Sequence, residues 1–413
     1  MSMDDCSPAV DIAQLRLDVK TRLRWCVLEA IELILEEEVA QVLGVARHER
    51  NERRSGYRNG SIRRTITTSQ GADTIRVPRA RVVDAAGGTR EFQSGLLPRY
   101  QRRTREVDEA ILGCYLAGAN TRRIRKALSP LLGEEHLSKS AISRVVGRLK
   151  GLFDQWRNRD LSSERYAVMF LDGFHLKVRL ARRVISAPVL VALGVSEDGS
   201  KQVIAMELAV RESGDSWGGF VESLIGRGLR APRLLVTDGH AGLKKARANW
   251  GEAISGDRPS FAVQRCTQHK WNNLKKACPN HAHGELHRDW TTVIGARNGE
   301  KARQAYEAML RKWSTLCPPV ARSLEEGGLE LLTFYNCPKA MWKGIRSTNA
   351  IENLNREFRR RTKTQGSFSN EEAAMTLLFG LIAFHQIVLR KISGCKHIAS
   401  WIHSTGTVPA LAA

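Results

Sequence analysis

The stretch FLDGFHLKVR, residues 170–179, decides the fold. Its apolar run predicts a buried strand that ends at Asp172, and the alternation from Phe174 to Arg179 predicts a half-exposed strand after it. The stretch LLVTDGHAGL, residues 234–243, places Asp238 in the same position after a second apolar run. Carboxylates at the ends of neighbouring strands would meet at one edge of a sheet, although an Asp-Gly turn is the alternative reason for each aspartate.

A third stretch, IRSTNAIENLNREFRRRTKTQGSF at residues 345–368, predicts a basic helix with Glu352 in its first turn. We expect Asn349 as the N-cap residue, because Glu352 follows it at the three-residue spacing of a capping box. Helix capping is therefore the alternative role of Glu352. The same helix face carries polar and basic residues that would line a phosphate track, namely Asn355, Arg356 and Arg359, extended by Arg360, Arg361 and Lys363.

These three carboxylates are suited to bind metal ions. Hard carboxylate oxygens are the ligands that Mg²⁺ and Mn²⁺ prefer. Two such ions about 4 Å apart can activate a nucleophile and stabilise the leaving oxygen of a phosphodiester. We therefore expect Asp172, Asp238 and Glu352 to be the catalytic and metal-binding residues of an enzyme that uses two Mg²⁺ or Mn²⁺ ions.

The charge of the chain favours a polyanionic partner. Among its 413 residues, 65 are Lys or Arg and 43 are Asp or Glu, so the formal net charge is +22. A surplus of this size favours nucleic acid through counterion release, and an anionic membrane surface is the alternative. No apolar stretch reaches the roughly 18 residues of a spanning helix, and the polar, acidic N-terminus through Asp5 lacks the pattern of a signal peptide.

The cysteines indicate the compartment. There are eight, they are scattered along the chain, and none forms a Cys-x-x-Cys pair. In a chain of this length they are typical of reduced, intracellular thiols. We therefore expect a cytoplasmic protein.

Two segments at the start of the chain differ in amino-acid composition. Residues from about Val10 to Val45 repeat apolar side chains at helical spacing, which predicts an amphipathic helix that either faces the core or forms a dimer. From Arg47 to about Arg105 the chain is rich in Arg and lacks Lys, which predicts a small β-containing or partly disordered arm. Its arginines, including Arg63 and Arg64, would contact DNA phosphates, and a solvated charged surface is the alternative.

Residues 106–155 predict a helix-turn-helix unit that binds DNA, although many helical hairpins have the same pattern. The expected elements are helices at Val107–Ala117 and Thr121–Leu128, a turn at Leu132–Gly133, and a basic third helix with the sequence SAISRVVGRL. Polar residues before the second and third helices are candidate N-caps: Asn120 or Thr121, and Ser138 or Ser140. The expected DNA contacts are Arg122, Arg123, Ser140 and Arg144.

The rest of the chain predicts three meandering strands followed by alternating helices and strands. Further strands are expected at Ser186–Val195, Gln202–Leu208, Arg233–Thr237 and Phe261–Gln264, and helices at Asp215–Gly226 and Ala241–Trp250. From about Thr267 to Pro338 the pattern is almost all helical. The first and fourth strands each deliver an aspartate, as in a ribonuclease H-like core.

Four motifs carry a resemblance to a known family: LDG, VTDGHAGL, QRCTQHKWNNL and RSTNAIENLNREFRRRTK. With RNGSIRRT nearer the start, they make nearly the whole chain similar to the Mutator-family transposases of bacterial insertion sequences. The resemblance implies an α/β catalytic core of ribonuclease H-like type, with a large all-helical insertion before Glu352, preceded by a mainly helical DNA-binding region. It also implies Asp172, Asp238 and Glu352 as the metal-binding DDE triad. Gly173 departs from the family pattern, and we expect no effect on catalysis.

The resemblance implies a DNA transposase that binds, as a homo-oligomer, the double-stranded terminal inverted repeats of its insertion sequence. It would cleave a phosphodiester and join the freed 3′-hydroxyl to target DNA, and in the cell it would associate with the nucleoid when bound to DNA. The alternatives are a catalytically silent DNA-binding regulator derived from a transposase and a nuclease without strand transfer.

Cys266 and His269 match a Cys-x-x-His signature of the family and admit three interpretations. They pack structurally, they act near the carboxylates, or they bind zinc together with Cys278 and His281, which repeat the same spacing. The spacing of an ordinary zinc finger is absent. The whole chain then divides into an N-terminal helix (1–46), an Arg-rich arm (47–105), a helix-turn-helix domain (106–155), the first part of the catalytic core (156–266), a helical insertion (267–340) and the final core helix with the C-terminal region (341–413).

Overall fold

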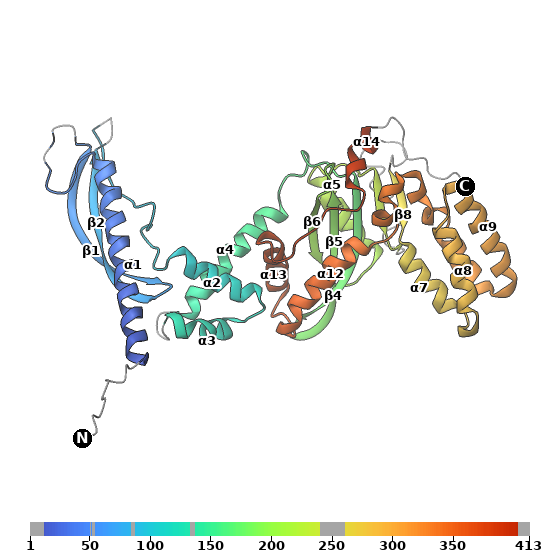
Figure 1. Cartoon of the computed structure of the whole chain (residues 1–413), viewed down its shortest axis with the longest axis horizontal. Coiled ribbons are helices and arrows are strands. Elements are labelled where there is room, and N and C mark those ends of the chain that lie inside the picture. Colours follow the sequence, from blue (N-terminus) through green and yellow to red (C-terminus); the bar gives the residue numbers. More distant parts are fainter. Residues whose placement is uncertain are drawn as a thin grey trace, which may run out of the picture. The chain divides into compact units, whose positions relative to one another are not determined.

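The structure, a computed structural model, describes residues 12–49, 51, 54–83, 87–132, 137–239 and 261–403, with side chains from Leu17 onward. The chain divides into two compact units, Met1–Arg148 and Leu149–Ala413. The first begins with a long helix beside a twisted hairpin, and the second is built around a sheet with helices on both faces (Figure 1). Within the described residues, no helix is long and apolar enough to span a membrane.

The first unit joins one long helix to a three-stranded antiparallel sheet of order β1-β2-β3. The elements are α1 (Ile12–Leu43), β1 (Gly56–Thr68), β2 (Gly71–Val83) and β3 (Thr89–Glu91). Helix α1 buries Leu35 and Val39 against apolar residues of the sheet, so it is core-facing along this side. Acidic side chains of the helix add polar contacts: Glu32 accepts from the backbone N–H of Arg76 at 2.6 Å, and Glu36 pairs with Arg58 at 2.5 Å.

The Arg-rich segment is therefore a β-hairpin with one short extra strand in its described part. Three helices follow: α2 (Arg105–Leu116), α3 (Thr121–Leu132) and α4 (Lys139–Arg157). Of the candidate N-caps, Asn120 accepts from the N–H of Arg123 at 3.0 Å and Ser138 accepts from that of Ala141 at 3.1 Å. The expected end of α3 at Leu128 was wrong, because Leu132, one turn later on the same face, is also buried. The expected turn residue Gly133 lies outside the described residues.

The second unit contains a five-stranded mixed sheet of order β6-β5-β4-β7-β8. Its strands are β4 (Val168–Leu180), β5 (Arg183–Val195), β6 (Lys201–Leu208), β7 (Leu234–Thr237) and β8 (Ala262–Arg265). The first three are antiparallel, β7 runs parallel to β4, and β8 runs parallel to β7. The α/β class is thus confirmed, and the helix expected at 241–250 lies outside the described residues.

Strand β4 corrects one expectation. It is a single strand through Asp172, whereas the sequence predicted that one strand ends at Asp172 and another begins at Phe174. Strand β5 pairs with the full length of β4, from Val168 to Leu180, but β7 pairs with β4 only as far as Leu171. The change from a continuous apolar run to alternation therefore marks the loss of one neighbouring strand and not a break in the backbone.

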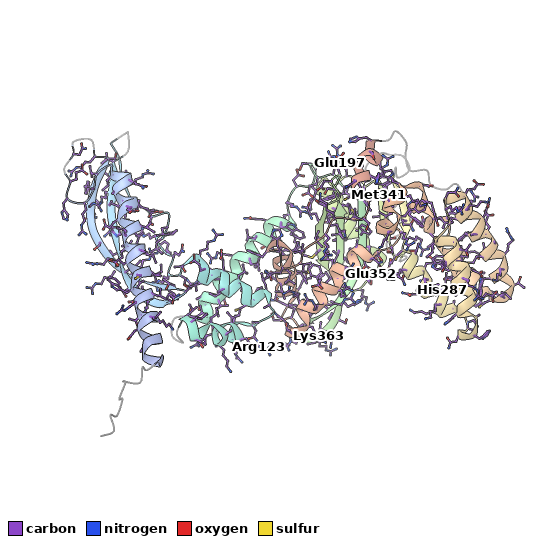
Figure 2. All side chains as sticks on the ribbon, in the orientation of Figure 1. Arg123, Glu197, His287, Met341, Glu352 and Lys363 are labelled. Atoms are coloured by element: carbon purple, nitrogen blue, oxygen red, sulfur yellow. The ribbon has the colours of Figure 1, made fainter. Side chains whose placement is uncertain are left out.

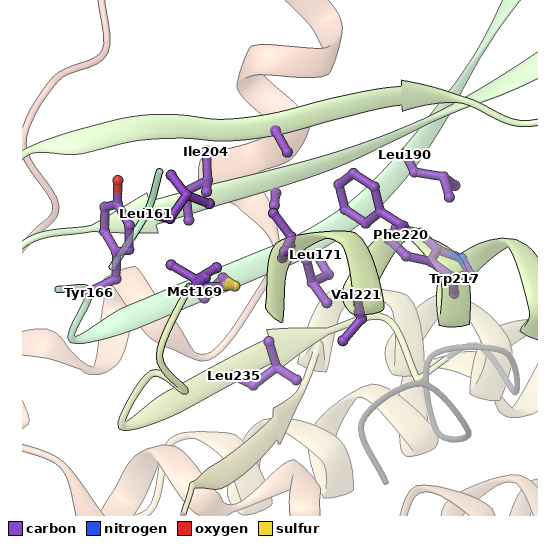
Figure 3. Packing of buried hydrophobic residues seen from close by; sticks show 14 of the residues in the cluster. Leu161, Tyr166, Met169, Leu171, Leu190, Ile204, Trp217, Phe220, Val221 and Leu235 are labelled. Carbon is purple, nitrogen blue, oxygen red and sulfur yellow. The ribbon is translucent and has the colours of Figure 1, made fainter. Parts of the chain in front are cut away.

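Different helices cover the two faces of this sheet. Leu171 lies in a buried cluster with Trp217 and Phe220 of α5 (Gly214–Gly226; Figure 3). Phe174 instead stacks on Phe358 of α12 (Asn349–Thr362), with ring centroids 5.5 Å apart. Because successive side chains of a strand point to opposite faces, Asp172 faces α12.

Helices and short turns fill the chain after β8. The longer helices are α7 (Thr267–Ala277), α8 (His283–Ile294), α9 (Gly299–Leu316), α10 (Pro318–Gly327) and α13 (Glu371–Ala383). Short helices and 3₁₀ turns are η1 (Asn280–Ala282), η2 (Leu329–Leu331), η3 (Thr333–Asn336), η4 (Lys339–Met341), α11 (Trp342–Ile345), η5 (Lys363–Gln365), η6 (Cys395–His397) and α14 (Ile398–His403). The helical pattern expected between 267 and 338 is confirmed.

Candidate active site

The sheet brings Asp172 and Asp238 to neighbouring positions. The parallel ladder of β4 and β7 ends with the pair Leu171 and Thr237, so each aspartate directly follows the last residue that its strand contributes to this ladder. Asp172 is buried on the α12 side of the sheet, and Asp238 is half-buried at the carboxyl end of β7. A ligand at this point of the sheet would meet both carboxylates.

Asp172 is buried beside two other carboxylates, and His269 is the basic side chain that partly offsets their charge. Burial raises the pKa of Asp172 to about 7, and the charges of Asp238 and, to a smaller extent, Glu352 act in the same direction, while His269 opposes them. Within the described part of the chain, no Lys or Arg forms an ion pair with Asp172 or Glu352. Carboxylates whose negative charges raise the pKa of a buried neighbour in this way suit a divalent cation.

A buried amide orients Asp172. Asn355, fully buried on α12, donates from Nδ2 to Asp172 Oδ2 at 3.0 Å. Asn355 was expected to line a phosphate track with Arg356 and Arg359 on the Glu352 face of the helix, whereas the structure places its amide against Asp172. Asn355 faces the sheet because it lies one turn before Phe358, which is buried against β4.

Glu352 lies in the first turn of α12, near enough to Asp172 for its charge to raise the pKa of that aspartate. The N-cap residue is Thr348, not the expected Asn349, which is already helical. The Thr348 hydroxyl donates to Glu352 Oε1 at 2.6 Å, so the carboxylate accepts from a side chain one turn earlier. The capping-box role considered for Glu352 is therefore wrong, and its side chain remains about one-third exposed. Figure 2 shows Glu352 and Lys363 at opposite ends of this helix.

Cys266 joins the starts of two helices beside Glu352. It is the N-cap of α7, and its Sγ accepts from the backbone N–H groups of His269 at 3.4 Å and of Thr348 at 3.3 Å. His269 Nδ1 lies 3.3 Å from the Thr348 hydroxyl and 3.7 Å from Glu352 Oε1. The structure thus places the Cys-x-x-His pair next to the candidate site.

These contacts shift the titration of both groups. Burial opposes the change, but hydrogen bonds from His269 and Thr348 lower the pKa of Cys266. The hydrogen bond with Cys266 and the nearby negative charges, including that of Glu352, raise the pKa of His269 to about 9 against the effect of burial. A protonated His269 beside Glu352 places positive charge at the edge of the carboxylate cluster.

The zinc interpretation that adds Cys278 and His281 does not fit. Cys266 and Cys278 cap opposite ends of α7, which has 11 residues. At about 1.5 Å per residue the two sulfurs are separated by roughly the length of the helix, far beyond the 2.3 Å zinc–sulfur bond. The ligand atoms that do cluster, within 4.8 Å of one another, are those of Cys266, His269 and Glu352.

Sequence patterns missed two groups of side chains near the site. Thr348 and Asn355 contact the carboxylates, but their roles depend on how α12 packs, which no local pattern shows. Lys270 and Arg265, both buried, share the carboxylate of Glu326 at 2.7 and 2.8 Å. The unusual density of polar residues in QRCTQHK, at the end of a buried strand and the start of the next helix, was the available signal for this ion cluster.

The candidate DNA-binding residues are distributed over both units. In the second unit, Arg356, Arg359, Arg360 and Lys363 are exposed on or just after α12, and Arg360 pairs with Glu357 at 2.7 Å. In the first unit, exposed positions on β1, α3 and α4 are those of Arg63, Arg122, Arg123, Ser140 and Arg144. Arg64 differs, because its guanidinium donates to the carbonyl oxygens of Leu97 and Pro98.

Comparison with known proteins covers nearly the whole chain. The family described as "Transposase, Mutator family" matches residues 7–386. The chain is 34% identical over 359 residues to the transposase for insertion sequence element ISRM5 of Rhizobium meliloti (strain 1021), across 87% of this chain and 86% of that relative. It is 33% identical to the transposase for insertion sequence element IS406 of Burkholderia multivorans, across 86% and 89% of the two chains. The transposase for IS256 in transposon Tn4001 of Staphylococcus aureus is 29% identical, across 84% and 85%. These matches confirm the resemblance carried by the motifs, and the chain belongs to the Mutator family of transposases.

Proposed function

We propose that the chain cleaves the ends of its own insertion sequence and joins them to target DNA, with Asp172, Asp238 and Glu352 as the catalytic carboxylates. The observation that carries this proposal is the position of Asp172: burial and the charges of Asp238 and Glu352 raise its pKa to about 7, and the β4–β7 ladder ends directly before both aspartates. Membership of a transposase family supplies the substrate class, DNA. The three residues would hold two Mg²⁺ or Mn²⁺ ions.

The sheet order supports a ribonuclease H-like core. Three antiparallel strands are followed by two parallel strands, in the order β6-β5-β4-β7-β8. Asp172 lies on the first of these strands in the chain and Asp238 follows the fourth. The helices between β8 and α12 form the helical insertion of this proposal, since they separate the second aspartate from Glu352.

The chemistry has two steps. In the first, a water oxygen bonds to phosphorus at the element end, the bond from phosphorus to the 3′ oxygen breaks, and that strand ends in a 3′-hydroxyl. In the second, this hydroxyl oxygen bonds to a phosphorus of the target, and the target's 3′ oxygen leaves and takes up a proton. When bound, the metal ions supply activation of the attacking oxygen and stabilisation of the leaving oxygen.

The chain's own residues keep the carboxylates in place. Asn355 fixes the orientation of Asp172, and Thr348 fixes that of Glu352. Cys266 holds the start of α12 to the start of α7 through its two N–H contacts. Partners of this kind typically change metal affinity or activity by about 10- to 100-fold when they are removed.

The first unit would bind the terminal repeats. Helices α2 to α4 have the order of a helix-turn-helix, with exposed Ser140 and Arg144 at the start of α4 able to reach base edges. Arg63 on β1 would contact phosphates. We propose that the protein acts as a homo-oligomer, because both ends of an element must be processed together.

A cleavage and joining assay on terminal-repeat DNA tests the function. Glu352→Gln removes one charged ligand and keeps the shape, so cleavage and joining should both fall at least 100-fold in Mg²⁺. Glu357→Gln is the matched control, because it makes the same change on the same helix at a residue that pairs with Arg360. Cleavage by Glu352→Gln at the rate of Glu357→Gln would remove Glu352 from the proposed site.

The products separate the alternatives. A transposase gives both nicked ends and molecules joined to target DNA, whereas a nuclease without strand transfer gives nicked ends alone. A catalytically silent regulator binds the repeats and gives neither product in Mg²⁺ or Mn²⁺.

A further inference from the structure

Helix α1 has a second apolar stripe, which the sheet does not cover. Val19, Leu23, Cys26, Ala30 and Leu33 are all exposed, and the exposed fractions of Val19, Leu23 and Leu33 are 56%, 52% and 60%. They follow one another at intervals of four, three, four and three residues, which is the spacing of a coiled-coil seam. At about 100° per residue, this stripe lies on the side of the helix roughly opposite the residues that pack on the sheet.

The charges of α1 are divided between its two halves. Four of its charged residues, Arg24, Glu32, Glu36 and Glu38, contact the sheet or the segment that follows it in the same chain. Of the others, the half before the middle of the helix carries Lys20 and Arg22 beside Asp18, and the half after it carries Glu29 and Glu37. Two parallel copies would place like charges beside each other, whereas two antiparallel copies place each basic half beside an acidic half. The charges that do not contact the sheet therefore favour the antiparallel arrangement.

We propose that α1 is a self-association surface on which a second copy of this chain packs its own α1 in antiparallel orientation. The spacing sets Leu23 against the partner's Leu33, and Cys26 against the partner's Ala30, and each contact occurs twice by symmetry. The small side chains of Cys26 and Ala30 in the middle let the two helices approach closely. The larger leucines at both ends of the seam exclude water from it.

This surface is separate from the carboxylate site, which lies in the other unit. The inference goes beyond the catalytic proposal, and its test needs neither DNA nor metal. Failure of self-association would therefore leave the proposed cleavage chemistry untouched, and failure of cleavage would leave this surface untouched.

The test measures the dimer dissociation constant of the full chain by sedimentation equilibrium without DNA. Leu23→Lys and Leu33→Glu should each weaken dimerisation at least tenfold, because each places two charges in the apolar seam. The double variant Leu23→Lys/Leu33→Glu should recover most of that loss, since antiparallel packing sets opposite charges against each other in both layers. Leu17→Lys is the matched control: Leu17 is 58% exposed on the same helix but lies off the seam spacing, so its dissociation constant should stay at the wild-type value.

Disulfide trapping gives an independent readout of orientation. Under mild oxidation, Ala30→Cys should form a covalent dimer through Cys26 of the other copy, and Cys26→Ser/Ala30→Cys should not. A monomeric wild-type chain, or a double variant no tighter than the single variants, would overturn the proposal. Efficient wild-type dimers linked through Cys26 alone would indicate parallel packing and overturn it as well. An equal loss of dimer affinity in Leu17→Lys would indicate non-specific apolar adhesion and would also overturn the proposal. Circular dichroism checks that each variant is folded.

Discussion

Replacing Thr348 with valine removes a single hydroxyl beside Glu352 and keeps the shape of the side chain. The hydroxyl donates to Glu352 Oε1 at 2.6 Å, while the backbone N–H of Thr348 still reaches Cys266 Sγ. A hydrogen bond to a charged group contributes about 1.5–3 kcal/mol. The Glu352 side chain is 34% exposed, so water can replace part of the lost bond and the lower end of that range applies. About 1.5 kcal/mol corresponds to roughly a tenfold effect.

The assay for Thr348→Val is single-turnover cleavage of a terminal-repeat duplex at a series of Mg²⁺ concentrations. Because Thr348 acts through a metal ligand, we expect the half-maximal Mg²⁺ concentration to rise about tenfold, with a smaller loss of rate at saturating metal. A general loss of folding would instead lower the amount of active protein at every metal concentration. The metal dependence therefore separates positioning of Glu352 from loss of structure.

Thr376→Val is the matched control for this experiment. Thr376 is also buried in the second unit, but its hydroxyl has no hydrogen-bond partner among the described residues. Removing an unsatisfied buried hydroxyl is neutral or stabilising, so the Mg²⁺ dependence should remain that of the wild type. If Thr348→Val and Thr376→Val have the same Mg²⁺ dependence, the Thr348 hydroxyl does not position Glu352.

Three further outcomes follow from the described contacts. The pKa of Asp172 in the folded state is about 7, above the ordinary value of 3.8. In metal-free buffer the folded state therefore binds this proton more tightly than the unfolded state and loses stability as the pH rises from about 4 to about 7. Thermal unfolding of Asp172→Asn should show a weaker pH dependence than that of the wild type. Glu326→Gln removes the carboxylate that the buried Lys270 and Arg265 share, which should lower the free energy of unfolding by about 3 kcal/mol in a denaturant titration. Arg63→Gln should weaken binding to all DNA sequences and reduce the salt slope by about 1, whereas Arg64→Gln, which loses bonds to backbone carbonyls, should mainly lower the thermal midpoint.

Local patterns were enough to predict the sheet and to select its aspartates. A buried apolar run that ends in a carboxylate is a signal within ten residues, and the segments around Asp172 and Asp238 both carry it. The same patterns misplaced the strand end at Asp172, because loss of the β7 neighbour changes the burial of β4 without changing its backbone. The pattern of apolar residues along a strand depends on which neighbouring elements cover it. That pattern changes where a neighbouring strand ends as well as where the strand itself ends.

The contacts that orient the carboxylates could not be predicted in this way. Asn355 was expected to contact phosphate from its spacing to Glu352, yet it donates to Asp172, because the packing of Phe358 on β4 turns this side of α12 toward the sheet. The sequence favoured Asn349 over Thr348 as the N-cap of α12. Both residue types are good N-caps, and the two positions differ by only one residue, which is within the uncertainty of a predicted helix end. Contacts between segments distant in the chain depend on packing, which residue spacing within one helix does not specify.

Iron-directed cleavage of the polypeptide tests most directly whether the three carboxylates form a metal site. Fe²⁺ can replace Mg²⁺ at oxygen-ligand sites, and with ascorbate and peroxide it generates radicals that cut the backbone next to the bound ion. The account predicts cuts near Asp172, Asp238 and Glu352, suppressed by excess Mg²⁺ and lost in Asp172→Asn. Cuts confined to other segments, such as the histidines between 281 and 287, or an unchanged pattern in Asp172→Asn, would contradict it.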